Sequence, residues 1–411
     1  MALGCEKMTK IKILFIGEIH SSHSRAWVSL LNTDEFDIRC FHIGNADLPE
    51  AHPHLTYCAK WAFGIKRSVF KFPTFSFMTK LGRRSLLPAR LVEKWNERWL
   101  AKIVRGWKPD IIHTLGFEAS AYFYQRVRSN YALGQIGRWV AQARGGPDLD
   151  LYRHLPEKLK KIRAVFDECD HFICDNEQNY TFAFANGLDR SKAEFPGVGV
   201  VSGPGGLDVD ELRSRWSKLP SQRHRRIVWP KTYEVISSKG LPVLEALIIA
   251  WDRIQPCEVD CLWMVQDELR IYFDKMLPEH IKAACNIYGH LTQKDTLDLV
   301  AAARVMLAPS LTDGVPNVMM EAMALGAFPI ISPLETTLPV VEDRKNVLFA
   351  RNLYPEEIAE ALVQAMNDDV LVDNAAKVNV ERVRELADRK KIRTRVIKFY
   401  REVKNLSRGE N

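Results

Sequence analysis

Residues 306–332 read MLAPSLTDGVPNVMMEAMALGAFPIIS and predict a strand, a loop, a helix and a second strand, in that order. The apolar run Val305–Ala308 has strand length and stops at a Pro-Ser pair. Pro316 stands where a helix readily begins, because proline has no N–H to leave unpaired there. Apolar side chains then follow helical spacing as far as Gly326, a C-terminal stop, and Phe328–Ile331 is the next strand. Such a βαβ unit predicts a parallel α/β sheet.

Two carboxylates accompany this unit. Asp313 lies in the loop and Glu321 lies one turn into the helix. In an open α/β sheet, ligands bind beyond the carboxyl ends of the strands, and a helix N-terminus presents free N–H groups to anions. We therefore expect both acids to face one crevice. The alternative from the residues alone is that Asp313 caps the helix and Glu321 is a solvated helix residue.

The same segment resembles the signature of the retaining GT-B nucleotide-sugar glycosyltransferases of glycosyltransferase family four. That signature has two glutamates eight residues apart, the second opening a helix that reads roughly EAMA-x-G-x-P-V. The matching positions here are Asp313, Glu321, Ala322, Met323, Ala324 and Gly326, and Pro329 stands one residue later than the proline of the signature. Asp313 stands where the family usually has Glu, which shortens the side chain by one methylene. The resemblance implies an α/β chain with two Rossmann-like doubly wound domains that face a central cleft.

The length of 411 residues is typical of two or three domains. We expect an N-terminal Rossmann-like acceptor domain at 1–210 and a polar, Arg-rich linker at 211–226. A C-terminal nucleotide-sugar-binding domain at 227–385 follows. The basic helix at 386–411 would return to the N-terminal domain, as the resemblance implies.

The composition, 46% hydrophobic and 27% charged, is that of a globular enzyme. No apolar run approaches the length of about 18 residues that a transmembrane helix needs, and the N-terminus lacks the apolar core of a signal peptide. The eight cysteines lack metal-binding spacing and are expected to be reduced and mostly packed. These features predict a cytoplasmic protein without a resident metal.

A basic stretch with many aromatic residues covers residues 60–108. It holds thirteen Lys and Arg residues against only Glu93 and Glu97, and bulky apolar side chains alternate with the cations. This pattern suits the headgroup layer of an anionic membrane and would place the protein on the inner face of the plasma membrane, with a lipid-linked acceptor. The alternative is a segment with its aromatics in the core and its cations in water. We find no nucleic-acid recognition module.

Two lysines stand where the resemblance implies contacts with the donor diphosphate. Lys231 ends a predicted strand and takes the place of a family arginine, and Lys239 precedes a glycine as it does in the family. The turn at His290 and Leu291 resembles one whose backbone contacts the nucleobase. The donor-binding residues implied by the resemblance are Lys231, Lys239, His290, Leu291, Gly314, Val315, Pro316, Asn317 and Glu321.

The acceptor side is implied by turns of the first domain. Arg144 begins the sequence RGGPD, which is similar to the family's H-G-S-D turn but has arginine in place of the histidine beside the reacting sugar. Arginine cannot act as a base at neutral pH, but it can stabilise developing charge. The resemblance implies catalytic roles for Asp313, Arg144 and Lys239. We place His20, His23, Arg25 and His113 on the acceptor side.

The resemblance implies a retaining, metal-independent transfer of a sugar from a nucleotide sugar to a glycan or lipid-linked acceptor, in the synthesis of cell-surface polysaccharide or glycolipid. The leaving phosphate would help to deprotonate the acceptor. The nucleotide sugar is a co-substrate, and no cofactor is expected. Two alternatives are a GT-B nucleotide-sugar epimerase and a non-catalytic, membrane-associated partner of a glycosyltransferase.

Overall fold

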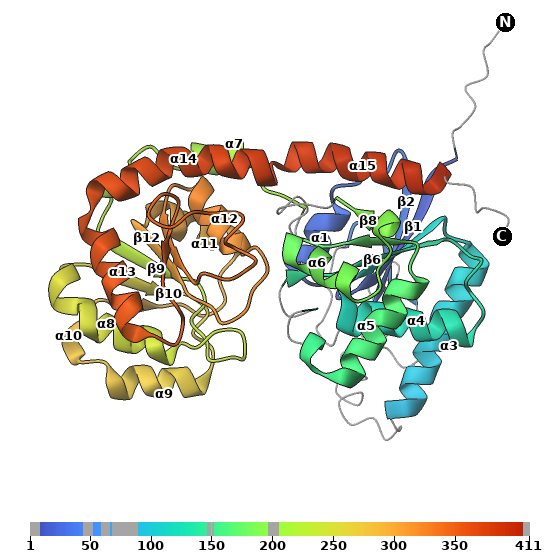
Figure 1. Ribbon diagram of the computed structural model, residues 1–411, viewed down its shortest axis with the longest axis horizontal. Helices are drawn as coiled ribbons and strands as arrows, with labels where there is room; N and C mark the ends of the chain where they lie inside the picture. Colours follow the sequence, from blue (N-terminus) through green and yellow to red (C-terminus); the bar gives the residue numbers. More distant parts are fainter. Residues whose placement is uncertain are drawn as a thin grey trace, which may run out of the picture.

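The computed structural model describes residues 9–43, 52–58, 66–67, 89–145, 149, 152–195 and 205–405. They form two α/β lobes that lie side by side, each built on one sheet (Figure 1). Two long helices near the C-terminus extend over the lobes and connect them. The prediction of two doubly wound α/β domains is confirmed.

The sheet of the first lobe has the strand order β4-β3-β2-β1-β5-β6-β7-β8 within the described residues. Its neighbouring strands are parallel except for the antiparallel pair of β3 and β4. Because helices cover both faces, central strands are mostly apolar, and in β1 only Lys12 interrupts the buried run. The strands are β1 (Ile11–Gly17), β2 (Phe36–His42), β3 (Leu55–Cys58), β4 (Lys66–Arg67), β5 (Ile111–Leu115), β6 (Arg138–Gln142), β7 (His171–Ile173) and β8 (Ala193–Glu194).

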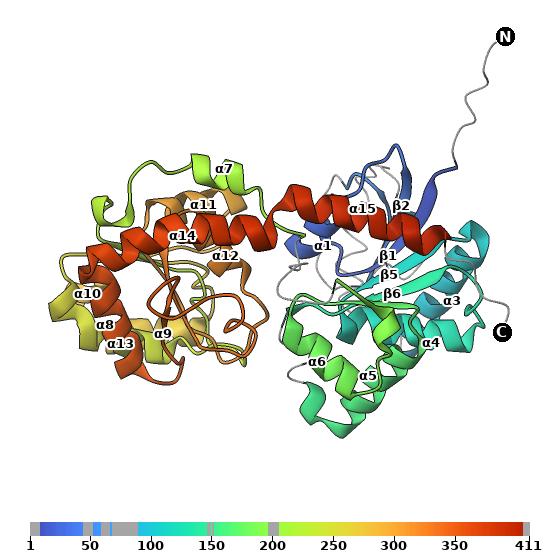
Figure 2. The same cartoon turned by 45° about the horizontal axis from the view of Figure 1, so that its top comes forward.

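Helices flank this sheet on both sides (Figures 1 and 2). The α-helices of the first lobe are α1 (Ser22–Val28), α3 (Ala89–Trp107), α4 (Tyr122–Asn130), α5 (Pro156–Glu168) and α6 (Glu177–Ala185). Most of the predicted basic stretch, residues 59–65 and 68–88, lies outside the described residues. In α3, the apolar Leu100, Val104 and Trp107 are buried, whereas Lys94, Arg98, Lys102 and Arg105 face solvent. For this helix the structure fits the alternative of a buried apolar face and solvated cations.

The second lobe has a parallel sheet in the order β11-β10-β9-β12-β13-β14. Its strands are β9 (Arg226–Trp229), β10 (Glu258–Cys261), β11 (Cys285–Ile287), β12 (Val305–Ala308), β13 (Phe328–Ile331) and β14 (Leu348–Phe349). The helices that follow the first lobe are α7 (Val209–Ser214), α8 (Leu241–Ile254), α9 (Asp267–Met276), α10 (Glu279–Lys282), α11 (Gln293–Ala302), α12 (Asn317–Ala324), α13 (Pro355–Asn367), α14 (Asp369–Ala387) and α15 (Arg389–Asn405).

The predicted βαβ unit is present as β12, α12 and β13. Pro316 is the N-cap residue of α12, as its position in the sequence predicted. Gly326 has a φ of +73°, which ends the helix in the left-handed conformation that glycine adopts most easily. Strand β13 pairs with β12 in parallel along its whole length. The loop between β12 and α12 therefore lies at the carboxyl edge of the sheet.

The two connections between the lobes are hydrogen-bonded to each other. The N–H of Leu207 donates to the carbonyl of Ala387 at 2.7 Å, and the N–H of Arg389 donates to the carbonyl of Leu207 at 2.9 Å. Gly206 has a φ of +86°, and a Cβ there would lie 2.6 Å from the Ala387 carbonyl oxygen. Only glycine therefore fits at this crossing.

The expected linker at 211–226 is corrected by this arrangement. Val209, Leu212 and Trp216 are buried in the core of the second lobe, and the indole of Trp216 donates to the carbonyl of Ala324 in α12 at 3.0 Å. The chain therefore crosses between the lobes near Leu207. The apolar side chains of α7 draw the following residues onto the second lobe.

Helix α15 packs on the first lobe, where Figure 2 shows it crossing above the sheet. Its buried face joins the core formed with β1, β2 and β5. The hydroxyl of Tyr400 accepts a hydrogen bond from Trp27 Nε1 at 3.0 Å and lies 2.6 Å from His113 Nδ1. All three side chains are fully buried. Within the described part of the chain, no helix has the length and apolarity that a membrane crossing requires.

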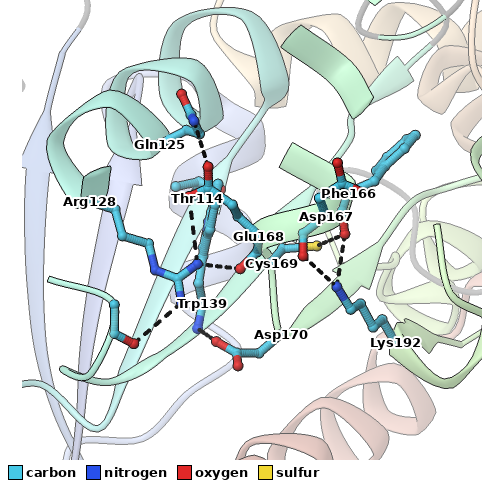
Figure 3. A network of polar contacts seen from close by, with 11 residues as sticks. Thr114, Gln125, Arg128, Trp139, Phe166, Asp167, Glu168, Cys169, Asp170 and Lys192 are labelled. Atoms are coloured by element: carbon cyan, nitrogen blue, oxygen red, sulfur yellow. Dashed lines mark hydrogen bonds and ion pairs between the residues drawn. The ribbon is translucent and has the colours of Figure 1, made fainter. Parts of the chain in front are cut away.

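A network of polar side chains fixes the end of α5 beside β6 and β7 (Figure 3). Arg128 of α4 donates to the carbonyl of Glu168, and Lys192 donates to two carbonyls of the last turn of α5 at 2.8 and 3.0 Å. Cations suit this helix end because its last carbonyls lack partners within the helix. The Asp170 carboxylate accepts from the N–H of Trp139 at 2.7 Å. These contacts fix the position of β7, which leads into the cavity described below.

Candidate functional site

A cavity of about 580 Å³ lies between the two lobes and is lined by residues from both. The first lobe contributes the loops after β1, β5, β6 and β7, and the second contributes the loop after β9 and the segment between β12 and α12. These are carboxyl ends of parallel strands, where open α/β sheets place ligands. The predicted site residues that line it are His23, Arg144, Lys231, Asp313, Gly314, Val315, Pro316 and Asn317.

Lys231 and Asp313 form an ion pair in the wall of this cavity. The ammonium of Lys231 contacts the Asp313 carboxylate and also donates to the hydroxyl of Ser310 at 2.9 Å. The side chains of Lys231 and Asp313 are only 12% and 25% exposed, so water screens the pair poorly. β9 and β12 are neighbours in the sheet, which brings together two residues far apart in the sequence.

The N-terminus of α12 opens into the same cavity. Val315, Pro316, Asn317 and Val318 line it, and Pro316 supplies no side-chain cap. The first N–H groups of an α-helix lack partners within the helix and carry a partial positive charge. This end of α12, together with Lys231, therefore favours an anionic group.

The first lobe presents Arg144 and His23 to the cavity. Arg144 Nη1 donates to the hydroxyl of Ser24 at 2.8 Å, and its Nη2 lies 3.5 Å from Gln142 Oε1. His23 Nδ1 lies 3.2 Å from Asn317 Nδ2 on the opposite lobe. Burial, followed by the nearby Arg144 guanidinium, lowers the pKa of His23, while Asp313 acts in the opposite direction. The imidazole is therefore neutral around neutral pH.

The lobes are in contact at the edge of the cavity. A Cβ added to Gly314 would lie 2.7 Å from both the Cα of Gly145 and Oδ2 of Asp175 on the first lobe. Glycine at 314 thus lets the loop of the second lobe approach the first lobe closely. Gln178 and Glu335 also contact each other across the lobes.

Several cavity residues were missed by the sequence reasoning. Asp175 follows strand β7 directly, is only 4% exposed, and accepts a hydrogen bond from the N–H of Gly145 at 2.9 Å. Burial raises the pKa of Asp175 to about 6. A carboxylate just after a buried strand is a sequence signal that could have predicted Asp175 as a site residue. Glu18, directly after β1, shows the same signal and also lines the cavity. Other unpredicted lining residues include Ser21, Ser120, Tyr233, Ser237 and Thr312.

Lys239 does not line the cavity, and its predicted catalytic and donor-binding roles stay predictions. Its ammonium pairs with Glu234 Oε1 at 3.2 Å, and its backbone N–H donates to Asn352 at 2.8 Å. Glu234 also accepts from the N–H groups of Gly240 and Leu241, at the start of α8. These contacts make Lys239 part of the structure at the beginning of α8.

The other predicted donor contacts also lie outside the cavity wall. Glu321 is in the second turn of α12, where burial raises its pKa to about 7 despite a hydrogen bond with Gln293. His290 and Leu291 follow strand β11 at the edge of the second sheet. The ring of His290 stands edge-on to Trp263, with centroids 4.7 Å apart. The proposed nucleobase turn is therefore separate from the inter-lobe cavity, and its role stays a prediction.

Three predicted acceptor contacts are placed elsewhere. His113 belongs to the core: its ring is fully buried and contacts Tyr400 of α15. Burial lowers the pKa of His113 well below its usual range. Arg25 is exposed on α1, and His20 packs edge-on against His42 with centroids 5.3 Å apart. The expectation that His113 faces the acceptor is wrong, because its side chain is fully buried beneath α15. His20 and Arg25 lie outside the cavity wall and their acceptor roles stay predictions, whereas His23 lines the cavity.

Within the described residues, no group of three or more His, Cys, Asp or Glu side chains is placed to hold a metal ion. Metal-independent chemistry stays a prediction. The cysteines that the structure describes are free thiols, most of them buried.

Residues 242–368 match the protein family described as Glycosyl transferases group 1. No curated protein sequence is significantly similar to the chain. This family match covers most of the second lobe, including the β12–α12 segment.

Solved structures resemble the chain over nearly its whole length. The Anabaena protein Alr3699/HepE in complex with UDP-glucose has a TM-score of 0.68 at 12% identity, covering 95% of this chain and all of the other. Sucrose-phosphate synthase from Thermosynechococcus elongatus has a TM-score of 0.64 at 15% identity, covering 96% and 99%. A UDP-forming α,α-trehalose-phosphate synthase from Burkholderia xenovorans has a TM-score of 0.65 at 13% identity, covering 97% and 100%. The chain therefore has the two-lobed GT-B fold of these structures, and residues 242–368 match the family described as Glycosyl transferases group 1.

Proposed function

We propose that the chain is a glycosyltransferase that moves a sugar from a nucleotide-sugar donor to a hydroxyl group of a glycan or lipid-linked acceptor. One observation carries this proposal. The Lys231–Asp313 pair and the N-terminus of α12 open into the same cavity as Arg144 from the opposite lobe. An anion site, a hydroxyl-binding carboxylate and a charge-stabilising cation thus line one cavity.

The donor side belongs to the second lobe. Lys231 and the N–H groups at the start of α12 neutralise the diphosphate. The diphosphate draws the ammonium of Lys231 away from Asp313, which leaves the carboxylate to accept hydrogen bonds from hydroxyls of the sugar. A UDP-sugar is the first donor to test, because the structurally similar HepE was solved with UDP-glucose.

The acceptor side belongs to the first lobe. Arg144 stays charged at any physiological pH, and Ser24 and Gln142 hold its guanidinium in place. It stabilises the negative charge that develops on the leaving diphosphate as the glycosidic bond forms. Retention of configuration at the anomeric carbon is part of the proposal and is supported by the resemblance to glycosyltransferase family four.

An anionic membrane surface is the proposed location of the acceptor. The solvent-facing side of α3 carries Lys94, Arg98, Lys102 and Arg105, and the indole of Trp95 is 51% exposed beside them. Cations around an exposed tryptophan suit a headgroup layer. This surface supports a role in glycolipid or cell-surface polysaccharide synthesis on the inner face of the plasma membrane.

A thermal-shift screen against nucleotide sugars tests the proposal. A ligand that binds only the folded protein raises its apparent stability. We expect at least one nucleotide sugar to raise the melting temperature of the wild type and to have a much smaller effect on Lys231→Ala. The surface variant Lys345→Ala is the control and should respond like the wild type. The absence of any response across the common nucleotide sugars would contradict the proposal.

A further inference from the structure

Asp175 is an almost fully buried carboxylate that nevertheless lines the inter-lobe cavity. It lies two residues beyond strand β7. Its Oδ2 accepts from the N–H of Gly145 at 2.9 Å, and its Oδ1 accepts from Asn176 Nδ2 at 2.8 Å. Two neutral donors hold the carboxyl group in one orientation. Neither brings a formal positive charge.

The carboxyl group faces the proposed donor loop of the other lobe. Oδ2 of Asp175 would lie 2.7 Å from a Cβ built on Gly314, so the carboxylate and the Gly314 backbone are in contact. Gly314 follows Asp313 directly and precedes the N-terminus of α12. Asp175 is therefore next to the space where the diphosphate and the anomeric carbon of a bound donor would lie.

The charged and titratable neighbours of Asp175 come from each element around it. Asp313 acts on it electrostatically from the second lobe, Cys174 precedes it after β7, and Tyr180 of α6 lies nearby with its hydroxyl bonded to the Cys174 backbone. Burial raises the pKa of Asp175 to about 6, the hydrogen bonds from Gly145 and Asn176 lower it in part, and Asp313 raises it further. The group is thus largely ionised at pH 7, yet basic enough to accept a proton.

We propose that Asp175 accepts the proton of the attacking hydroxyl, in the sugar transfer stated above under Proposed function, on which this inference rests. The O–H bond of the acceptor breaks and its proton moves to the Asp175 carboxylate. The acceptor oxygen forms a bond to the anomeric carbon. The bond from that carbon to the diphosphate oxygen breaks, and its electron pair leaves with the diphosphate. The carboxylic acid then returns its proton to water.

The other carboxylates of the cavity are less suited to this step. Asp313 contacts Lys231 and, in the proposal above, binds hydroxyls of the donor sugar once the lysine moves to the diphosphate. Glu18 is exposed to solvent. His23 is the remaining candidate base, but its Nδ1 lies 3.2 Å from the Asn317 amide nitrogen of the opposite lobe. The family resemblance implies that the leaving phosphate takes the proton of the acceptor. We assign this proton instead to the carboxylate of Asp175, which would lie beside that phosphate.

The Asp175→Asn variant distinguishes a purely structural role of Asp175 from a role as a base. Its hydrogen bond from Gly145 needs only an oxygen acceptor, and asparagine provides one. Asp175→Asn therefore keeps the turn at Gly145 while removing the group that can be protonated. If Asp175 only positions this turn, the variant retains both turnover and its pH dependence.

The test follows release of nucleoside diphosphate with water as the acceptor, between pH 5 and 8.5, using a nucleotide sugar that stabilises the wild-type protein. We expect the wild-type rate to fall below an apparent pKa near 6, since protonated Asp175 cannot accept a proton. Asp175→Asn should lower the rate by about 100-fold and lose this acid limb. Its thermal shift with the same donor should remain, which shows that it is folded and binds.

Three results would overturn the inference. The first is an Asp175→Asn variant with wild-type rates, the second is an unchanged acid limb in that variant, and the third is loss of the limb in His23→Gln instead. A wild type that binds a donor but releases no nucleoside diphosphate also counts against it. Failure of the proposed function is seen separately, because then no nucleotide sugar stabilises the wild type at all.

Discussion

Lys231 and Asp313 contact each other from the loops that follow the adjacent strands β9 and β12, at the edge of the second sheet that lines the inter-lobe cavity. Their side chains are mostly buried in the cavity wall, and Ser310 provides a further hydrogen bond to the lysine. The structure therefore holds a cation and an anion together before any substrate binds. A donor with a negative diphosphate and neutral sugar hydroxyls can separate these two charges and satisfy each of them.

Gly314→Ala is expected to weaken closure of the two lobes. The new Cβ would lie 2.7 Å from both Gly145 Cα and Asp175 Oδ2, closer than atoms pack without a shift. The loop or the lobes must move apart, so nucleoside diphosphate release should fall and the radius of gyration from small-angle X-ray scattering should rise. Gly106→Ala is the control, since a Cβ there meets nothing within 4 Å. Equal scattering and equal rates in both variants would show that the lobes do not depend on this contact.

Glu321→Gln is expected to change how stability depends on pH. Burial raises the pKa of Glu321 from its ordinary value of 4.5 to about 7 in the folded protein. The folded state therefore binds the proton more tightly than the unfolded state, so this contribution to stability is complete below pH 4.5 and is lost as pH rises through 7.

Melting temperatures measured between pH 4.5 and 8 check this prediction. The wild type should lose more stability than Glu321→Gln over this range. The titration of Asp175 changes the stability of both proteins in the same direction, so its contribution cancels when their melting temperatures are compared. Parallel curves for the two proteins would mean that Glu321 titrates at its ordinary pKa.

Tyr400→Phe is expected to destabilise the first lobe. The hydroxyl of Tyr400 serves both Trp27 and His113 in a fully buried cluster, and its removal leaves two buried polar groups unpaired. The expected loss in the free energy of unfolding is about 1–3 kcal/mol, measured by urea denaturation. Tyr272→Phe, at an exposed position on α9, should change it by less than about 0.5 kcal/mol. If Tyr400→Phe is as stable as the control, the hydrogen bonds of Tyr400 do not hold α15 on the first lobe.

The basic surface of α3 is expected to bind anionic vesicles. Replacing Arg98, Lys102 and Arg105 with alanine should reduce sedimentation with phosphatidylglycerol vesicles at low salt, because each cation near the surface contributes about 1 kcal/mol. A second triple variant, Lys294, Lys345 and Lys377 to alanine, removes the same charge from the second lobe and should bind like the wild type. Equal loss in both variants would indicate a net-charge effect, and no binding by the wild type would end the membrane proposal.

The sequence pattern predicted part of the second-lobe site, because that part depends on neighbouring parallel strands. Rules for such sheets place the ends of β9 and β12 at one edge, where Asp313 and the start of α12 were expected and where the resemblance implied Lys231. The apolar pattern and the strand geometry differ at one place. Leu262–Val265 fits a strand by its apolar residues, but β10 is Glu258–Cys261, and Trp263 has a φ of +66°, outside strand geometry.

The first lobe was less predictable because contacts there come from distant parts of the chain. His113 lies near the carboxyl end of β5, the position at which we expected a ligand-binding histidine. Its side chain instead points to the face of β5 that α15 covers. Asp175 faces Gly314 only because of how the two lobes are oriented, and no periodicity within either lobe encodes that orientation.

The central claim is that the inter-lobe cavity activates a nucleotide sugar through Lys231. Its most direct test is the rate of nucleoside diphosphate release from a stabilising nucleotide sugar, compared between the wild type, Lys231→Ala and the surface control Lys345→Ala. We predict slow release by the wild type and the control, and a rate about 100-fold lower for Lys231→Ala, the typical effect of removing one group that stabilises developing charge. Equal rates for Lys231→Ala and the wild type, or no release by the wild type, would contradict the claim.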